Sequence, residues 1–225
     1  MACFYGVGCN FLSDGHETEL MMDIDKNTPI FQNVFGGSWD ALPVVMKRHY
    51  ANRPFSSDVG VVDGIMDVES SFLGRMMSPF FKLTGTLVPY EGKDVPAKVE
   101  FSSSPTTNGF HFNRTFYFPN QKPYEFKSVM IPMTGNEMIE VMRFGLCWRM
   151  AFLWTGQKVV WEHRGFGVYL WGKYIPLPLA LLMGKGFADE TPIDDESFSM
   201  SMKIVHPIWG MVFGYSGVFK MVKDV

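Results

Sequence analysis

The chain has 225 residues, of which 47% are hydrophobic and 19% are charged, and its formal net charge is −3 at pH 7. This composition is typical of a folded globular protein and argues against an intrinsically disordered chain. The slightly acidic charge also argues against a nucleic-acid-binding protein, which would carry a basic surface. The three cysteines, Cys3, Cys9 and Cys147, show no CxxC spacing, so the sequence predicts neither a disulfide framework nor a zinc site.

Residues 1–27 carry several Asp and Glu side chains and show little periodicity, so we expect a poorly ordered acidic extension. The segment lacks the basic start and the continuous apolar run of a secretory signal. No part of the sequence reaches the roughly 18 consecutive apolar residues that a membrane-spanning helix needs. We therefore expect a cytoplasmic protein in which residues 28–225 form a single domain, and unpaired thiols also favour that location.

Helix signals follow in the N-terminal third. Thr28 and Pro29 form an N-cap and first-turn proline that predict a helix over residues 30–35. Ser38 is suited to cap a second helix over residues 39–50. After a predicted strand at 57–68, residues 70–83 repeat apolar side chains at helical spacing, and Pro79 would kink or end that helix. The sequence thus predicts two or three helices in this part of the chain.

From residue 94 onward the apolar residues recur with period two, which is typical of β-strands. The predicted strands occupy residues 97–102, 109–118, 124–131, 137–144, 146–154, 159–171, 187–191, 198–205 and 211–222. Short turns between consecutive strands predict antiparallel pairing. The predicted fold class is α+β, with a strongly curved antiparallel sheet or an open β-barrel of about eight to ten strands.

The segment 109–118 contains the most informative pattern. Every second residue from 110 to 118 is phenylalanine except Arg114, so the guanidinium shares one strand face with four rings. Arginine is rarely buried without a partner. Arg114 is therefore expected either to pair with an internal carboxylate or to face a cavity in which an anionic ligand could bind.

Further polar side chains occur on neighbouring predicted strands. If these strands face one interior, Glu162 would pair with Arg114 or Arg164, and Arg149 would assist. An excess of arginine over carboxylate would leave a cation facing an apolar cavity, which suits a carboxylate or phosphate head on a lipid-like tail. A closed internal ion-pair network, or positions that reach solvent, is the alternative. The expected wall of the cavity consists of Phe110, Phe112, Phe116, Trp148 and Trp161.

The sequence offers little support for catalysis or metal binding. It contains no H-E-x-x-H or H-x-H motif and no G-x-S-x-G nucleophile elbow. Glu162 and His163 are adjacent, but consecutive residues of a strand point to opposite faces, so they cannot act directly as an acid–base pair. We therefore predict no catalytic residue, no metal ion and no cofactor.

Several short motifs occur in a characteristic order along the chain. They are FQNVFG at 31–36 with Trp39 and Leu42-Pro43, GKDVP at 92–96 leading into VEF at 99–101, NRTF at 113–116, YIPLP at 174–178, HPIWG at 206–210 and YSG at 215–217. This order resembles the uncharacterised bacterial domain-of-unknown-function family 4166. The resemblance extends over residues 28–222 and implies a domain without an established activity. Members of that family also occur fused to the C-terminal end of saccharopine-dehydrogenase-like reductases, which implies a reductase as a partner.

These observations lead to three hypotheses. The first is a module that binds a hydrophobic, lipid-like anion in the concave face of the sheet, with Arg114 at the head group. The second is an enzyme or reductase-associated domain with a pocket formed by Glu162 and His163. The third is a structural or protein-interaction domain with a filled core. A cavity behind the Phe face would favour binding, and an acid and a base within hydrogen-bond reach would favour catalysis.

Overall fold

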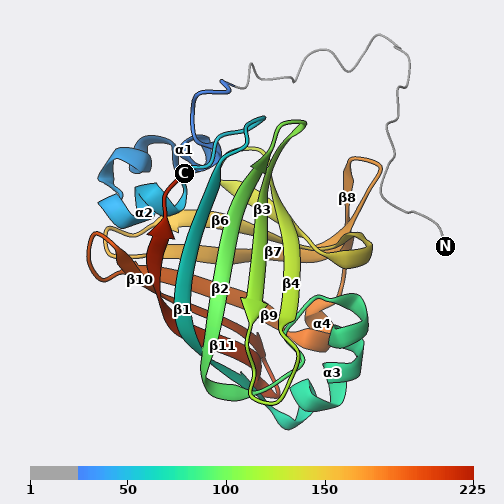
Figure 1. Ribbon diagram of the computed structural model, residues 1–225. Coiled ribbons are helices and arrows are strands. Elements are labelled where there is room, and N and C mark those ends of the chain that lie inside the picture. Colours follow the sequence, from blue (N-terminus) through green and yellow to red (C-terminus); the bar gives the residue numbers. More distant parts are fainter. Residues whose placement is uncertain (1–24) are drawn as a thin grey trace, which may run out of the picture.

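The computed structural model describes residues 25–225 of the chain (Figure 1). Nearly all of the acidic extension predicted at residues 1–27 therefore lies outside the described residues. In the described part, antiparallel strands form one sheet that closes on itself, and short helices lie at its two ends. The predicted α+β class with a strongly curved antiparallel sheet is confirmed.

The strands show the alternation of buried and exposed residues that the sequence predicted. In β10, for example, Phe198, Met200, Met202 and Ile204 are buried, and the intervening serines are only partly buried. The strands are β1 (Val59–Ser70), β2 (Gly92–Ser104), β3 (Thr107–Phe116), β4 (Tyr124–Pro132), β5 (Glu137–Val141), β6 (Leu146–Trp154), β7 (Val159–Leu170), β8 (Lys173–Leu177), β9 (Lys185–Pro192), β10 (Ser197–His206) and β11 (Gly210–Lys223).

Strand β7 closes the sheet into a barrel. The strand order is β6-β5-β4-β3-β2-β1-β11-β10-β9-β7-β8, and β6 also pairs with β7, so a ring of ten strands forms with β8 attached to its outside. On the edge opposite β6, the residues Val159–Trp161 of β7 pair with β9, and Phe166–Leu170 pair with β8. The barrel is therefore closed rather than open. Strand β7 is long enough to pair with three neighbours, so no strand of the ring has an unpaired edge.

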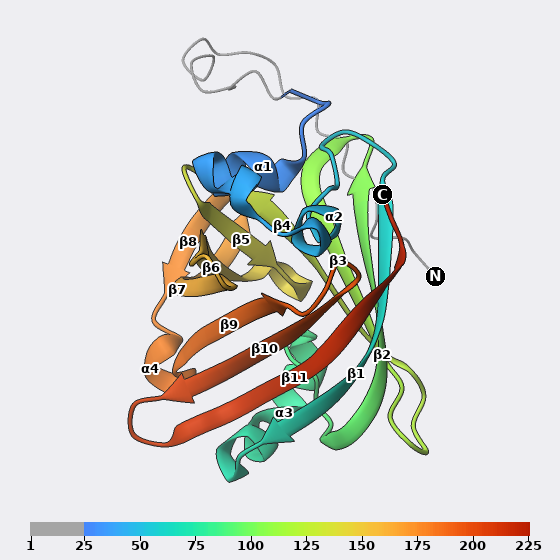
Figure 2. The same ribbon diagram turned by 90° about the vertical axis from the view of Figure 1, so that its left-hand side faces the viewer.

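The helices lie at opposite ends of this barrel (Figures 1 and 2). The predicted second helix is divided, because Pro43 holds Leu42 in an extended conformation (φ −67°, ψ 138°) between η1 and α2. At one end lie α1 (Ile30–Phe35), η1 (Gly36–Ala41) and α2 (Val44–His49); near the other end lie α3 (Phe72–Thr84), the turn η2 (Arg143–Gly145) and α4 (Ala180–Met183).

Aromatic side chains fill the end of the barrel beneath α1. The ring centre of Phe31 lies 4.5 Å from that of Tyr50, 5.0 Å from that of Phe110 and 5.2 Å from that of Phe152. All four side chains are buried. Tilted and edge-to-face contacts of this kind are favourable between aromatic rings. This end of the barrel is therefore packed shut, and Phe110, expected in a cavity wall, belongs to the filled core.

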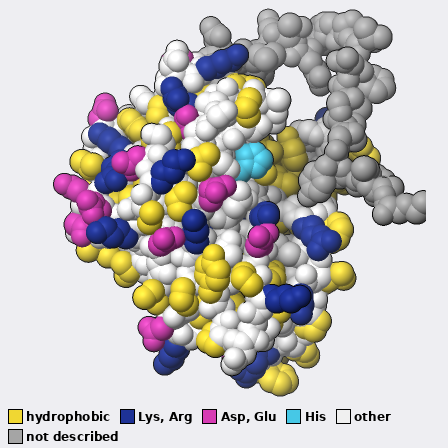
Figure 3. Space-filling view, in the orientation of Figure 1, with side chains coloured by type: hydrophobic (Ala, Val, Ile, Leu, Met, Phe, Trp, Pro, Cys, Tyr) yellow, Lys and Arg dark blue, Asp and Glu magenta, His cyan; other side chains and the backbone are white. Residues whose placement is uncertain are grey.

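Helix α3 is apolar on two faces. It crosses β11 so closely that a Cβ atom on Gly74 would lie 2.2 Å from the carbonyl oxygen of Val212, and Phe81 is buried on this side. The opposite face is exposed by 49–76% at its four large side chains, Phe72, Met76, Phe80 and Leu83. Figure 3 shows hydrophobic and basic side chains next to each other over the lower right of the molecule, where α3 lies in Figure 1.

Candidate functional site

A hollow lies inside the barrel on the side of α3 and α4. The space between its atoms measures about 710 Å³, which includes the solvent-open space at its mouth. The enclosed part is smaller than this volume and suits a narrow apolar molecule rather than a bulky one.

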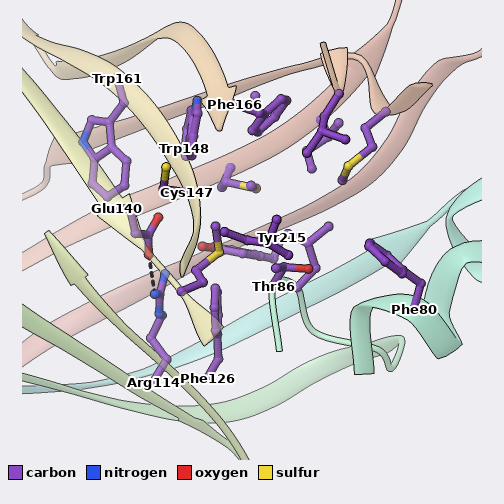
Figure 4. Close-up of a pocket in the computed structure, with 18 residues that line it drawn as sticks. Phe80, Thr86, Arg114, Phe126, Glu140, Cys147, Trp148, Trp161, Phe166 and Tyr215 are labelled. Carbon is purple, nitrogen blue, oxygen red and sulfur yellow. Dashed lines mark hydrogen bonds and ion pairs between the residues drawn. The ribbon is translucent and has the colours of Figure 1, made fainter. Parts of the chain in front are cut away.

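The wall of the hollow is mostly apolar, and its charged groups lie away from the mouth (Figure 4). Phe80 of α3 stands at the mouth and is 49% exposed, whereas Trp161 of β7 lies on the far side and is 2% exposed. Trp148, Phe166 and Met202 form part of the wall between them. A ligand that enters past α3 would thus meet aromatic and aliphatic side chains before it reaches a charge.

Arg114 of β3 is buried and lines this hollow. Its guanidinium carbon lies 3.9 Å from the ring centre of Phe112 and 3.9 Å from that of Phe126. Phe112 precedes Arg114 by two residues on the same face of β3, and Phe126 is the cross-strand neighbour of Arg114 on β4. Local alternation and strand register together place the cation between two aromatic faces, which attract it electrostatically.

Glu140 of β5 balances the charge of Arg114. Arg114 Nη2 donates to Glu140 Oε1 at 2.5 Å and to the hydroxyl oxygen of Ser128 at 2.5 Å. Ser128 of β4 in turn donates to Glu140 Oε1 at 2.6 Å. All three side chains are buried. The sequence left open whether Arg114 has an internal partner or faces a cavity, and in the structure it does both.

The ion pair leaves hydrogen-bonding capacity in the hollow. The hydrogen bonds from Arg114 to Glu140 and Ser128 both come from Nη2, whereas the buried Nε has no acceptor within residues 25–225. Tyr215 of β11 also lines the hollow. Burial raises the pKa of its phenol, although the charge of Arg114 and a side-chain hydrogen bond with Arg114 act in the opposite direction. Tyr215 is therefore a neutral hydroxyl. A polar group of a ligand could bind between these donors.

Three of the predicted site residues lie on the outer surface of the barrel. Arg149 of β6 pairs with Glu137 at 2.5 Å, and Arg164 of β7 pairs with Glu162 at 3.0 Å. The side chains of Arg149, Glu162 and Arg164 are 37%, 44% and 43% exposed. The pairing expected between Glu162 and Arg164 is thus formed, but neither of them reaches Arg114. This placement corrects the expectation that the three residues share an interior with Arg114.

A β-bulge in β7 explains that difference. The register between β6 and β7 shifts after Arg149, which pairs with Gly165, and Arg164 is the extra residue. Gly165 has a φ of 150°, which favours glycine. Alternation along β7 reverses at this point, so Phe166 lines the hollow although strict alternation would place it on the face of Glu162.

The predicted aromatic wall is divided between two hollows. Trp148 and Trp161 line the main one. Phe112 and Phe116 line a smaller one that also borders Arg114. The aromatic face of β3 therefore contributes to the site mainly by packing around the guanidinium, and the tryptophans of β6 and β7 supply the wall.

His163 has a structural partner rather than an acid beside it. Trp148 Nε1 donates to His163 Nδ1 at 2.9 Å. Burial lowers the pKa of His163, and the charge of Lys185 lowers it further, so the neutral imidazole accepts this bond. Glu162, the neighbour in sequence, pairs with Arg164 on the outer surface. The pocket that would combine Glu162 with His163 is therefore not formed.

A second buried carboxylate borders the smaller hollow. Glu190 of β9 accepts a hydrogen bond from the Tyr50 hydroxyl, and its Oε1 lies 3.3 Å from His49 Nε2. Burial and then the charge of Glu190 raise the pKa of Tyr50 well above its ordinary value. These contacts join α2 and Tyr50 to the barrel wall. Together with the aromatic side chains around Phe31, they close this end of the barrel.

The sequence pattern does not single out Glu140, Ser128 or Tyr215 as site residues. A signal for Glu140 is present, since alternation along β5 places it on the same face as the buried Met138. A carboxylate within a short apolar strand is unusual because charged side chains are rarely buried without a partner, which is also true of Arg114 in β3. The information that the sequence lacked was the strand order that brings β3, β4 and β5 together.

The described residues show few features of a metal or thiol site. Within residues 25–225 no three His, Cys, Asp or Glu side chains gather closely enough to hold a metal ion. Burial raises the pKa of the Cys147 thiol to about 11, so the thiol is protonated at neutral pH and is a poor nucleophile. Among the helices of the same residues, none has the length and apolar character needed to cross a membrane.

Residues 42–219 match the model of the protein family described as Domain of unknown function (DUF4166). The chain belongs to this family. The matched region begins before α2 and ends within β11, so the hollow and all its lining residues lie inside the family domain. No curated protein and no solved structure matches the chain. The DUF4166 description assigns no activity, and a shared fold does not by itself determine function.

Proposed function

We propose that this DUF4166 domain binds a small, lipid-like acid inside its barrel. The observation that carries the proposal is an apolar hollow, open to solvent at its mouth, that reaches a buried arginine whose Nε–H has no acceptor among the described residues. Binding sites for small molecules are typically apolar with a few polar groups that orient the ligand. The tail would lie against Trp148, Phe166 and Met202, and the head group would accept hydrogen bonds from the Arg114 guanidinium.

The partner of Arg114 sets the charge of the bound head group. Glu140 already balances Arg114, so a bare carboxylate would place two negative charges against one positive charge in a poorly hydrated site. An acid that keeps its proton can accept from Arg114 and donate to Glu140 without any net charge. We therefore modify the expectation of an anionic ligand: the acid binds with uptake of one proton from neutral solution.

Calorimetry with octanoic acid tests this proposal. Titrations in two buffers of different ionisation enthalpy would show uptake of one proton, and the affinity would fall about tenfold per pH unit above neutrality. Glu140→Gln should abolish the proton uptake and the pH dependence, because Arg114 can then bind the carboxylate itself. Met202→Trp, which fills the hollow, should abolish binding. Arg149→Met, an arginine on the outer surface of the barrel, should leave it unchanged.

Two results would contradict the proposal. One is a dissociation constant for octanoic acid weaker than about 1 mM, which corresponds to only about −4 kcal/mol. The other is binding that Met202→Trp does not weaken, since the ligand would then lie outside the hollow. If octanoic acid binds but Glu140→Gln keeps the pH dependence, the hollow is the site and the proton-sharing arrangement is wrong.

Two further parts of the proposal rest on the sequence rather than on the site. The family resemblance supports a nicotinamide-dependent reductase as a partner, which would act on the acid that the barrel holds or releases. The lack of a disulfide spacing pattern among the three cysteines of the sequence supports a cytoplasmic location. Co-purification of a reductase with the tagged chain, tested with the Met202→Trp variant as a control, would support a partnership that depends on the ligand.

A further inference from the structure

Four exposed segments surround the mouth of the hollow. They are residues 72–85 around α3, 142–147 around η2, 179–186 around α4, and 206–212 in the β10–β11 turn. The first three contribute Phe80, Met142 and Leu179, among others, to the lining of the hollow. The fourth contacts α4, where His206 Nε2 lies 3.2 Å from the carbonyl oxygen of Leu181. Together these four segments are named the mouth rim.

The mouth rim exposes an unusual amount of apolar surface. The large apolar side chains of α3 are continued by Phe144 in η2, which is 63% exposed. They are continued on the other side by Leu181 and Leu182, at 81% and 60%, and by Ile208 and Trp209, at 77% and 66%. Apolar side chains gathered in this way on adjacent segments mark an interaction surface.

The charge of the mouth rim is opposite to that of the chain. The whole chain has a net charge of −3, yet the four segments contain no Asp or Glu. They contain four basic side chains, Arg75, Lys82, Arg143 and Lys185, and all four are exposed. Arg75 pairs with Glu91 outside the rim at 3.4 Å, but such an exposed pair is weak. The rim is therefore both apolar and cationic.

We propose that the mouth rim docks on a lipid bilayer whose surface carries anionic head groups. Apolar side chains with basic ones beside them are the combination that holds peripheral segments at such a surface. The exposed Trp209 suits the boundary between head groups and acyl chains. Phe80 links the two sites, since it lines the hollow and is also 49% exposed.

Docking in this orientation turns the mouth of the hollow toward the acyl chains. A lipid-like molecule could then pass between bilayer and barrel without crossing water. This inference goes beyond the proposed function and does not depend on it, because most of the exposed side chains that would hold the bilayer lie outside the hollow. The two can therefore fail separately.

Sedimentation with vesicles tests the docking. The full chain should bind vesicles of phosphatidylcholine with about one third phosphatidylglycerol at least tenfold more tightly than phosphatidylcholine alone, and salt should weaken the binding. The double variant Phe72→Gln/Leu83→Gln removes two exposed side chains of α3 that do not line the hollow. It should lose at least tenfold in vesicle binding and bind octanoic acid as the wild type does.

A matched control is available at the opposite end of the barrel. Ile193, in the β9–β10 turn, is 55% exposed, and the adjoining Asp195 carbonyl accepts a hydrogen bond from Arg48 of α2. Ile193→Gln should leave vesicle binding unchanged. Lys82→Glu/Arg143→Glu should remove the preference for phosphatidylglycerol.

Three outcomes would overturn the proposal. The wild type would fail to sediment with either kind of vesicle, or Phe72→Gln/Leu83→Gln would bind as tightly as the wild type. The third outcome is a wild type that binds no vesicles but is a dimer by light scattering, while Phe72→Gln/Leu83→Gln is a monomer. In that case the mouth rim would join two copies of the chain.

Discussion

Replacing Arg114 by methionine would leave Glu140, which is 4% exposed, without the cation that balances it. Removing one partner of a buried ion pair costs about 3–5 kcal/mol, because the other charge stays desolvated. In a chain of this size about 1 kcal/mol changes the Tm by roughly 2–4 °C. We therefore expect Arg114→Met to lower the Tm by roughly 6–20 °C. On the sequence alone, with no partner for Arg114, the same change would be expected to leave the fold intact.

The double variant Arg114→Met/Glu140→Leu removes both charges at once. Ser128 keeps a partner, since its hydroxyl can donate to the Phe112 carbonyl oxygen at 3.4 Å. Apolar replacement of a complete buried ion pair is often neutral or even stabilising. The double variant should therefore recover most of the stability that either single variant loses, with a coupling energy of about 3 kcal/mol in the double-mutant cycle.

Urea unfolding followed by circular dichroism would measure the free energy of unfolding for the wild type, Arg114→Met, Glu140→Leu and the double variant. Arg149→Met is the matched control, because its partner Glu137 lies at a partly exposed position, and it should cost no more than about 1 kcal/mol. The stabilising role of the Arg114–Glu140 pair is refuted if Arg114→Met lowers the free energy of unfolding no more than this control does. It is also refuted if the losses in the two single variants simply add in the double variant. Either result would mean that water screens the pair inside the barrel.

Two further predictions concern packing and pH. Gly74→Ala should destabilise the fold by about 1–3 kcal/mol in urea unfolding, because its Cβ would lie 2.2 Å from the Val212 carbonyl oxygen. Gly37→Ala is the control and should not destabilise the fold, since no atom lies within 4 Å of the new Cβ. Equal effects of the two changes would contradict the close approach of α3 to β11. Because burial lowers the pKa of His163 in the folded state, its contribution to stability is present above the ordinary value of about 6.5 and is lost as the pH falls below it. The Tm should therefore fall as the pH is lowered from about 7.5 to 5.5, and it should fall less in His163→Gln. Burial also lowers the pKa of His111, which accounts for part of the fall that remains in this variant. An unchanged pH dependence of the Tm in His163→Gln would exclude His163 as a cause.

The sequence by itself determined the properties that depend on near neighbours along the chain. Period-two alternation identified the strands and predicted antiparallel pairing, because successive side chains of a strand point to opposite faces. The same alternation placed Arg114 on a buried aromatic face, where it needs a partner or a cavity. Apolar spacing also predicted the helix of α3, but it could not show that one apolar face of this helix packs on β11 and the opposite face is exposed.

Only the tertiary structure decided which groups meet inside the barrel. Glu140 lies 26 residues from Arg114, and the two are neighbours because β4 lies between their strands. A bulge at Arg164 reversed the alternation of β7, so Phe166 faces the hollow although Glu162 faces outward, and one extra residue of this kind leaves no reliable trace in a periodic pattern. Pairing order, register and closure are set by contacts between distant segments, so the carboxylate beside the buried cation and the apolar, cationic rim around the mouth emerge only when the strands are assembled.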